Sequence, residues 1–274
     1  MGAVARLIVG RGHYAPAVEA SEATDLDRER SVGEILSTSL SVYRHYPLLF
    51  ATLAVGVIAP YELARLAVTG DGPLGSGGNG KTGALLLFEL VYYVLVGPLI
   101  SALHVHAVVE IGAGRRPTLG SVAVRGLRVL PVVAAAEIIA GILIALGFVA
   151  FIVPGIILAL RWSVVAQTAA IDHEGWMPAL RRSGRLAAGN YWHILRLLLA
   201  IGVLTFVVGL LAGAVTAGGR GTSVASVLIG IVVYTLIASF SALTLAILYF
   251  DLRARETGPR PSSISSHEDL PEAG

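Results

Sequence analysis

Six apolar stretches constrain the fold of this chain more than any other feature of its sequence. They cover residues 48–68, 84–109, 130–150, 154–171, 192–217 and 223–250. A helix needs about 20 apolar residues to cross the hydrocarbon core of a bilayer. Backbone groups in lipid must find their hydrogen-bond partners within the protein, which a helix provides within itself. The sequence therefore predicts an all-α polytopic membrane protein, a bundle of six transmembrane helices.

The composition supports a membrane protein and excludes several functional classes. Charged residues make up 14% of the chain, against about 25% in soluble domains. Cysteine is absent, so there is no disulfide, thiol nucleophile or cysteine-ligated metal. The net charge of +2 is too small to indicate a nucleic-acid-binding surface. Lys81 is the only lysine beside many arginines, a composition typical of a GC-rich prokaryotic genome.

Arginine is distributed unevenly among the segments that connect the predicted spans. The second and fourth connections and both ends of the chain are rich in arginine, whereas the odd-numbered connections hold only Lys81 and Arg220. Because basic residues stay on the cytoplasmic side, we expect a multi-pass protein of the cell (plasma) membrane with both termini in the cytoplasm. The polar residues 1–30 and 253–274 are predicted to be disordered ends around a membrane domain at 31–252.

A short amphipathic segment precedes every second predicted span, at residues 31–47, 117–131 and 175–192. We expect three amphipathic helices at the cytoplasmic face, in a pseudo-threefold repeat of one such helix and two spans. Their arginines are candidate contacts for anionic lipid headgroups. These candidates are Arg125, Arg128, Arg181, Arg182 and Arg185.

One glycine-rich segment matches the phosphate-binding loop of nucleotidases. Residues 75–82, Gly-Ser-Gly-Gly-Asn-Gly-Lys-Thr, fit the pattern G-x-x-x-x-G-K-[ST]. That loop requires a buried strand before it and a soluble sheet beneath it. Here it lies between two predicted spans, on the side opposite the arginines. We therefore expect an outer connection, with no nucleotide and no cofactor bound.

Charged side chains within the predicted spans are candidates for a functional site, because each costs about 2.5 to 3.5 kcal/mol near the membrane centre on insertion scales. Glu62 and Arg65 are three residues apart and can pair on one helical face near the outer end. Glu137 and Arg161 lie on adjacent spans, where we expect an ion pair between helices. Glu89 precedes two tyrosines by one turn. Glu89, Glu137 and Arg161 are thus a possible intramembrane polar site for a lipid headgroup, an ion or a proton.

The histidines give no metal site. His104 and His106 are two residues apart, so they point to different faces of a helix, and we expect them at the membrane interface. His106 shares a face with Glu110, but two ligands do not make a metal site.

Two segments carry a resemblance to a known membrane domain. Residues 153–200 combine Pro-Gly, an apolar stretch with an arginine, the pattern Ala-Leu-x-x-Ser and then Gly-Asn-Tyr-Trp. Residues 33–50 resemble the first helix of the same membrane domain. The matching positions are Pro154, Gly155, Arg161, Ala179, Leu180, Ser183, Gly189, Asn190, Tyr191 and Trp192. The chain resembles the membrane domain attached to some glycerophosphoryl diester phosphodiesterases and related six-span bacterial and archaeal proteins. The phosphodiesterase itself is a soluble barrel, for which this chain has neither the motif nor the room.

Three functional classes follow from these observations. The first is a non-enzymatic role in membrane, lipid or envelope homeostasis, in contact with membrane lipids and with a protein partner that the sequence does not identify. The second is a small transporter or channel whose polar path is lined by Glu89, Glu137 and Arg161. The third is an intramembrane lipid-modifying enzyme. No serine–histidine pair, metal-ligand set or cofactor motif supports the third class, so we predict no catalytic residues and expect no enzyme.

The predicted topology can be tested by cysteine labelling, because the native chain has no cysteine. We expect single cysteines at residues 78 and 184 to react with an impermeant maleimide from opposite faces of the membrane. Labelling of both from the same face would contradict the topology and the location of the glycine-rich loop.

Overall fold

The computed structural model describes residues 26, 28–70, 82–172, 175–217 and 224–257, and every element in these ranges is helical. The elements are α2 (Val32–His45), α3 (Pro47–Thr69), α4 (Thr82–Val91), the π-helix η1 (Tyr92–Val96), α5 (Gly97–Gly112), α6 (Leu119–Ala150), α7 (Ile152–Arg161), α8 (Val165–Asp172), α9 (Trp176–Ala187), α10 (Tyr191–Ala217) and α11 (Val224–Thr257).

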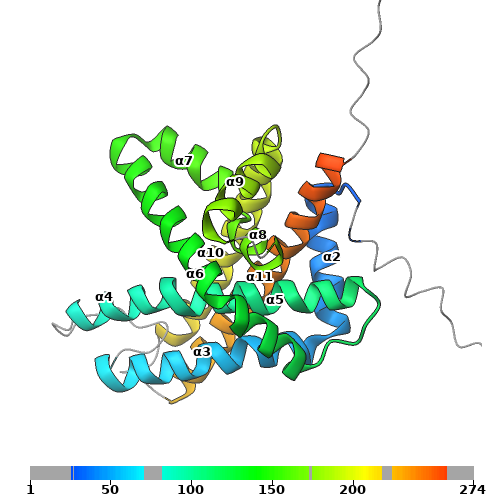
Figure 1. Ribbon diagram of the computed structural model, residues 1–274. Helices are drawn as coiled ribbons and strands as arrows, with labels where there is room; N and C mark the ends of the chain where they lie inside the picture. The colour runs from blue at the N-terminus through cyan, green and yellow to red at the C-terminus, as the bar shows by residue number, and fades with distance from the viewer. Residues whose placement is uncertain (1–25, 27, 71–81, 173–174, 218–223, 258–274) are drawn as a thin grey trace, which may run out of the picture.

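Six helical segments in the described part of the chain are long and apolar enough to cross a membrane, which confirms the predicted spans. They are Pro47–Thr69, Thr82–Gly112, Leu119–Ala150, Ile152–Asp172, Tyr191–Ala214 and Val224–Thr257. In Figure 1, α2 and the C-terminal end of α11 lie on the right, and the end of α3 and the start of α4 lie on the left. The glycine-rich loop with Lys81 lies outside the described residues, as do most of the two predicted disordered ends.

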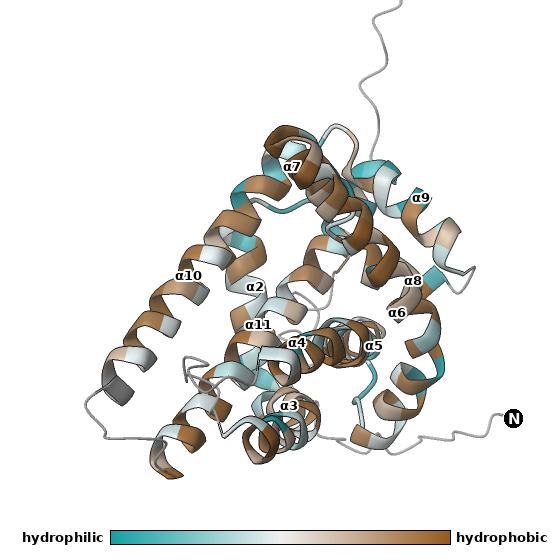
Figure 2. Ribbon diagram, turned by 90° about the vertical axis from the view of Figure 1, so that its left-hand side faces the viewer, coloured by the Kyte–Doolittle hydropathy of each residue, from teal (hydrophilic) through white to brown (hydrophobic). Residues whose placement is uncertain are grey.

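The fold is packed most tightly on the side of α2 and of the end of α11, called here the inner side. Residues 102–108 of α5 and residues 246–252 of α11 are buried all around their helices. On the opposite, outer side, α4 buries none of its residues. The helices therefore separate toward the outer side, where α10 stands apart from α3–α5 and carries a mostly hydrophobic surface (Figure 2).

Helix α2 begins at a capping box. The backbone N–H of Ser31 donates to the Glu34 carboxylate at 2.7 Å, and the backbone N–H of Glu34 donates to Ser31 Oγ at 3.3 Å. These hydrogen bonds, led by the one from the Ser31 backbone, lower the pKa of Glu34. Ile35 and Val42 on the opposite face are buried where α2 packs against α11. The predicted start of this helix is confirmed, and its apolar face is used for packing within the protein.

Asp251 joins three segments of the chain at the inner side. Its fully buried carboxylate accepts the backbone N–H of Arg30 at 2.5 Å and the Arg255 Nε–H at 2.9 Å. His193 Nε2, at the start of α10, lies 3.1 Å from the same carboxylate. Arg255 in turn donates to the Arg30 carbonyl at 2.7 Å. Arg30, at the end of the segment predicted to be disordered, is thus fixed against α11.

The second predicted amphipathic helix is wrong as a separate element. Residues 119–131 form the first turns of α6, which continues without a break to Ala150 although Pro131 lies inside it. With 32 residues, α6 is about 48 Å long at 1.5 Å per residue, whereas the hydrocarbon core is about 30 Å thick. The helix is therefore longer than the hydrocarbon core is thick, and Arg125 and Arg128 lie in its first turns.

The third predicted amphipathic helix is present as α9, but the protein covers its apolar face. Leu180 and Ala187 are buried where α9 packs against α6, α7, α8 and α11. Two hydroxyl groups fix this packing: Thr168 donates to the Ala179 carbonyl at 3.0 Å, and Ser183 donates to the Arg161 carbonyl at 3.1 Å.

The environment of α9 also bears on the labelling experiment. Gly184 is buried, and a Cβ there would lie 2.9 Å from Arg161 Nε. Arg181 is exposed on the same helix and is the better position for a labelling cysteine.

The turn between α6 and α7 brings two glycines into direct contact. A Cβ added at Gly147 would lie 3.1 Å from Gly155 Cα, 3.2 Å from Gly155 N and 2.9 Å from Leu158 Cδ1. Two helices can approach this closely only where side chains are missing. Gly141, six residues earlier on α6, has nothing within 4 Å of an added Cβ.

We expect Gly147→Ala to destabilise the protein by about 1–3 kcal/mol, because the methyl group would push α7 away from α6. The measurement is thermal unfolding of the purified protein in detergent. Gly141→Ala is the matched control and should leave the midpoint unchanged or raise it. Equal midpoints for the two variants would contradict the close packing of this hairpin.

Candidate functional site

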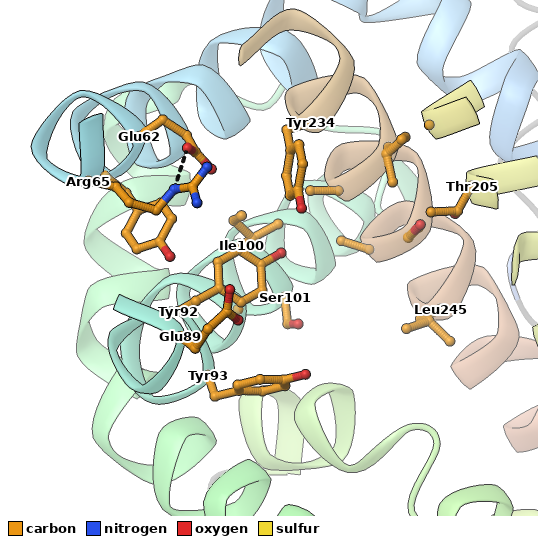
Figure 3. Close-up of a pocket in the computed structure, with 17 residues that line it drawn as sticks. Glu62, Arg65, Glu89, Tyr92, Tyr93, Ile100, Ser101, Thr205, Tyr234 and Leu245 are labelled. Carbon is orange, nitrogen blue, oxygen red and sulfur yellow. Dashed lines mark hydrogen bonds and ion pairs between the residues drawn. The ribbon is translucent and has the colours of Figure 1, made fainter. Parts of the chain in front are cut away.

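A cavity of about 590 Å³ opens between α3, α4, η1, α5, α10 and α11, where the helices separate (Figure 3). Its volume falls in the range of about 300–1,000 Å³ that is typical of small-molecule sites. Its walls combine charged, phenolic, hydroxyl and aliphatic side chains. They include Glu62, Arg65, Glu89, Tyr61, Tyr92, Tyr93, Tyr234, Ser101, Thr205, Ser241, Ile100 and Leu245.

An ion pair on α3 forms one wall of the cavity. Arg65 Nε donates to Glu62 Oε2 at 3.0 Å, one helical turn apart. The pair was predicted from the sequence and is confirmed. It is not an exposed surface pair, because the side chains of Arg65 and Glu62 are only 12% and 3% exposed. Burial makes each partner depend on the other, since an unpaired charge in this position is costly.

Four aromatic rings lie side by side along the cavity. Tyr61 from α3 packs on Phe88 and Tyr92 with ring centroids 5.8 and 5.7 Å apart, and Tyr92 packs edge to face on Tyr93 at 6.1 Å. The Tyr61 hydroxyl donates to the Phe88 carbonyl at 3.1 Å. The cluster joins α3 to the chain around η1 and leaves tyrosine faces toward the cavity.

The π-helix places two consecutive tyrosines in the same cavity. In η1 the Gly97 backbone N–H donates to the carbonyl of Tyr92, which is five residues earlier in the chain. In an α-helix the acceptor would be the carbonyl four residues earlier. Pro98, which follows, has no N–H with which to continue the α-helical pattern. Such π-helical turns inside α-helices occur frequently at functional sites.

Glu89 extends into the cavity from α4 and is exposed there (Figure 3). Among the described residues, no ion pair joins it to an arginine or histidine. The charges of Glu62 and Arg65 balance each other, so the ionised form of Glu89 leaves the cavity wall with a net negative charge.

The predicted ion pair between Glu137 and Arg161 is wrong. The Glu137 carboxylate accepts the Ser101 hydroxyl at 3.3 Å, so it lies directly behind the cavity wall. Arg161, exposed at the end of α7, extends toward Gly184 on α9. Counted from the turn at Phe151, Glu137 is about four residues further along its helix than Arg161, an offset of about 6 Å at 1.5 Å per residue. Of the three residues predicted to form one polar site, only Glu89 lines the cavity, and Glu137 lies behind its wall at Ser101.

An apolar groove of about 260 Å³ continues from the cavity toward α2. The cavity and the groove share Thr205, Ile237 and Ser241 as lining residues. The rest of the groove is formed by side chains of α2, α10 and α11 that are mostly aliphatic or aromatic, such as Leu40 and Phe240. The cavity and the groove thus lie next to each other along α10, with the polar cavity toward the outer side and the apolar groove toward the inner side.

The histidines of α5 are buried within the protein, whereas their position relative to the membrane interface stays a prediction. His104 is fully buried, with Nε2 2.8 Å from Ser239 Oγ and Nδ1 2.8 Å from the Ile100 carbonyl. Its ring also stacks on Phe50 at 5.4 Å. His106 is 6% exposed. Both side chains are part of the packing of α5 against its neighbours.

The arginines predicted to contact lipid headgroups fall into two groups. Arg125 lies 3.6 Å from Glu110, and Arg182 lies 2.6 Å from Glu256, so these two also hold helices together. Arg128, Arg181 and Arg185 are exposed on the surface of α6 and α9.

Sequence reasoning missed the contribution of Tyr61, Tyr234, Ser101 and Thr205 to the cavity. These residues lie on four different helices, and no spacing along the chain signals that they meet. Only Tyr92 and Tyr93 could be associated with Glu89 from the sequence, because they follow it by one helical turn.

No group of three or more acidic, histidine or cysteine side chains that could hold a metal occurs among the described residues. No family model, curated protein or solved structure matches the chain.

The ion pair in the cavity can be tested by removing one partner or both. We expect Arg65→Gln to lower the free energy of unfolding by about 2 kcal/mol, because it leaves the buried Glu62 carboxylate without its charged partner. The double variant Glu62→Gln, Arg65→Gln should lose less, since no stranded charge remains. Chemical denaturation in mixed micelles measures both. A double variant that is less stable than Arg65→Gln would argue against the coupling.

Proposed function

We propose that this protein is a non-enzymatic membrane protein that holds a single amphiphilic lipid between α10, α11 and the layer of α3–α5. The observation that carries the proposal is that the polar cavity adjoins the apolar groove, with Thr205, Ile237 and Ser241 lining both. A lipid is likewise polar at its headgroup end and apolar along its acyl chain. Its headgroup matches the cavity, and its acyl chain matches the groove.

The depth of the polar groups favours a lipid over a water-soluble ligand. Glu62 is seven residues before the end of α3, and Glu89 is seven residues after the start of α4. Seven residues correspond to about 10 Å along a helix. The cavity therefore begins roughly at the level of lipid headgroups and the first carbons of the acyl chains, and α10 separates it from the surrounding bilayer.

The proposal includes an orientation in the cell membrane. Both termini lie in the cytoplasm, with exposed Arg128, Arg181 and Arg185 at the cytoplasmic boundary near anionic lipid. The cavity then lies in the outer leaflet. Within this arrangement α2–α5, α6–α8 and α9–α11 are three related units. The resemblance to the membrane domain of certain glycerophosphoryl diester phosphodiesterases is consistent with a role in lipid homeostasis.

The alternative of a transporter or channel has weaker support. It relied on a path lined by Glu89, Glu137 and Arg161, and Arg161 extends toward α9 instead of the cavity. A transporter would also have to move its ligand between the two sides, and the described residues of the inner half are packed around Asp251 and α5.

A tryptophan at the junction of cavity and groove tests lipid binding. Thr205 lines both, so we expect Thr205→Trp to reduce the lipid retained after purification at least about tenfold, equivalent to about 1.4 kcal/mol. Native mass spectrometry of the detergent-purified protein measures the retained lipid.

The matched control is Leu210→Trp, because Leu210 lies on the same helix and is 61% exposed on its outer surface. This variant should retain lipid like the wild-type protein. Wild-type protein that never retains lipid would overturn the proposal, and solute flux in liposomes would then favour the transporter.

A further inference from the structure

We propose that the cavity selects lipids whose headgroup carries both a phosphate and an ammonium group. This inference rests on the proposed lipid-binding function and specifies the class of ligand. Three features of the cavity carry it: the carboxylate of Glu89, the tyrosine rings beside it, and Arg65 on the neighbouring α3 wall.

The first feature is the charge of the cavity wall. Glu62 is paired with Arg65 at 3.0 Å, whereas Glu89 has no ion-pair partner among the described residues. A carboxylate that faces a cavity attracts a cation, and the attraction is stronger than in bulk water where protein and lipid lower the effective dielectric constant. An ammonium group supplies that cation.

The second feature is the aromatic wall beside Glu89. Tyr92 and Tyr93 lie one turn further along the chain, and Tyr234 faces them from α11 across the cavity (Figure 3). Tyr61 packs on Tyr92 at 5.7 Å and completes this wall. The faces of aromatic rings attract cations, and clusters of rings recognise ammonium groups of ligands. A neutral headgroup such as glycerol gains no comparable interaction.

The third feature is Arg65, which lines the same cavity from α3 while its Nε is paired with Glu62. Guanidinium groups bind phosphate oxygens strongly. A zwitterionic headgroup can thus place its phosphate toward Arg65 and its ammonium toward Glu89. An anionic headgroup without an ammonium group would satisfy only Arg65 and would be repelled by Glu89.

Competition between two lipids with identical acyl chains tests this inference. The purified protein is exchanged into mixed micelles with equal amounts of phosphatidylethanolamine and phosphatidylglycerol, and native mass spectrometry gives the ratio of the two retained lipids. We expect phosphatidylethanolamine to be enriched at least about fivefold, in line with the modest energies of partly exposed ion pairs and cation–π contacts. Glu89→Gln should bring the ratio close to one.

Glu29→Gln is the matched control for the loss of a carboxylate. Glu29 lies outside the cavity, at the inner side, where it is 58% exposed and 3.8 Å from Arg255. This variant should keep the wild-type ratio. If Glu89→Gln does not fold, Tyr234→Leu tests the aromatic wall in its place and should lower the enrichment.

The outcomes separate this inference from the function on which it rests. If the protein retains both lipids equally, the proposed selection for an ammonium-bearing headgroup is wrong, although lipid binding itself is supported. The same holds if the preference for phosphatidylethanolamine persists in Glu89→Gln. Arg44 lies on α2, one helical turn after Leu40, which lines the groove. Loss of lipid only in Arg44→Gln would place the headgroup near α2 and overturn the inference. Absence of any retained lipid would overturn both.

Discussion

The buried carboxylate of Asp251 is the interaction on which the arrangement of the helices depends. A carboxylate without water must be surrounded by hydrogen-bond donors or cations, and Asp251 obtains them from the chain before α2, from α10 and from its own helix α11. The start of α10 is therefore tied to the end of α11, and Ile194 and Leu197 are fully buried next to this point. Because α10 is held at this end, its outer half can diverge from its neighbours without leaving the protein.

The divergence of α10 explains why a polar cavity can exist in an otherwise apolar bundle. Polar groups in hydrocarbon must be satisfied by the protein or by something bound to it. Glu62 and Arg65 satisfy each other, Tyr61 bonds to a backbone carbonyl, and Glu137 receives the hydroxyl of Ser101. Glu89 is the charged side chain of the cavity for which the described residues provide no ion pair. The packed inner half thus fixes the fold, and the open outer half leaves the space in which we propose that a ligand binds.

The sequence predicted those parts of the structure that depend on local patterns. Hydropathy located the six spans, and the spacing of three residues predicted the pair of Glu62 and Arg65. Contacts between helices were not predictable, because they depend on how far one helix is shifted along another. The shift of about four residues between α6 and α7 separates Glu137 from Arg161. The role of Asp251 was not predictable either, since its partners Arg30 and His193 are distant from it in the sequence.

The turn between α6 and α7 indicates where the boundary of the bilayer lies on this side of the molecule. Phe151, Ile152 and Val153 at its tip are 76%, 70% and 65% exposed, which is unfavourable in water. The Phe151 N–H bonds to the Gly147 carbonyl, and Pro154 has no N–H, so Ile152 and Val153 supply the amides of this helix start that still need a partner. The apolar side chains favour hydrocarbon, whereas the unpaired N–H groups need hydrogen-bond acceptors. The boundary between the hydrocarbon core and the headgroups provides both. We therefore expect the tip of this hairpin to lie at one boundary of the hydrocarbon core and to fix how deeply α6 and α7 enter the bilayer.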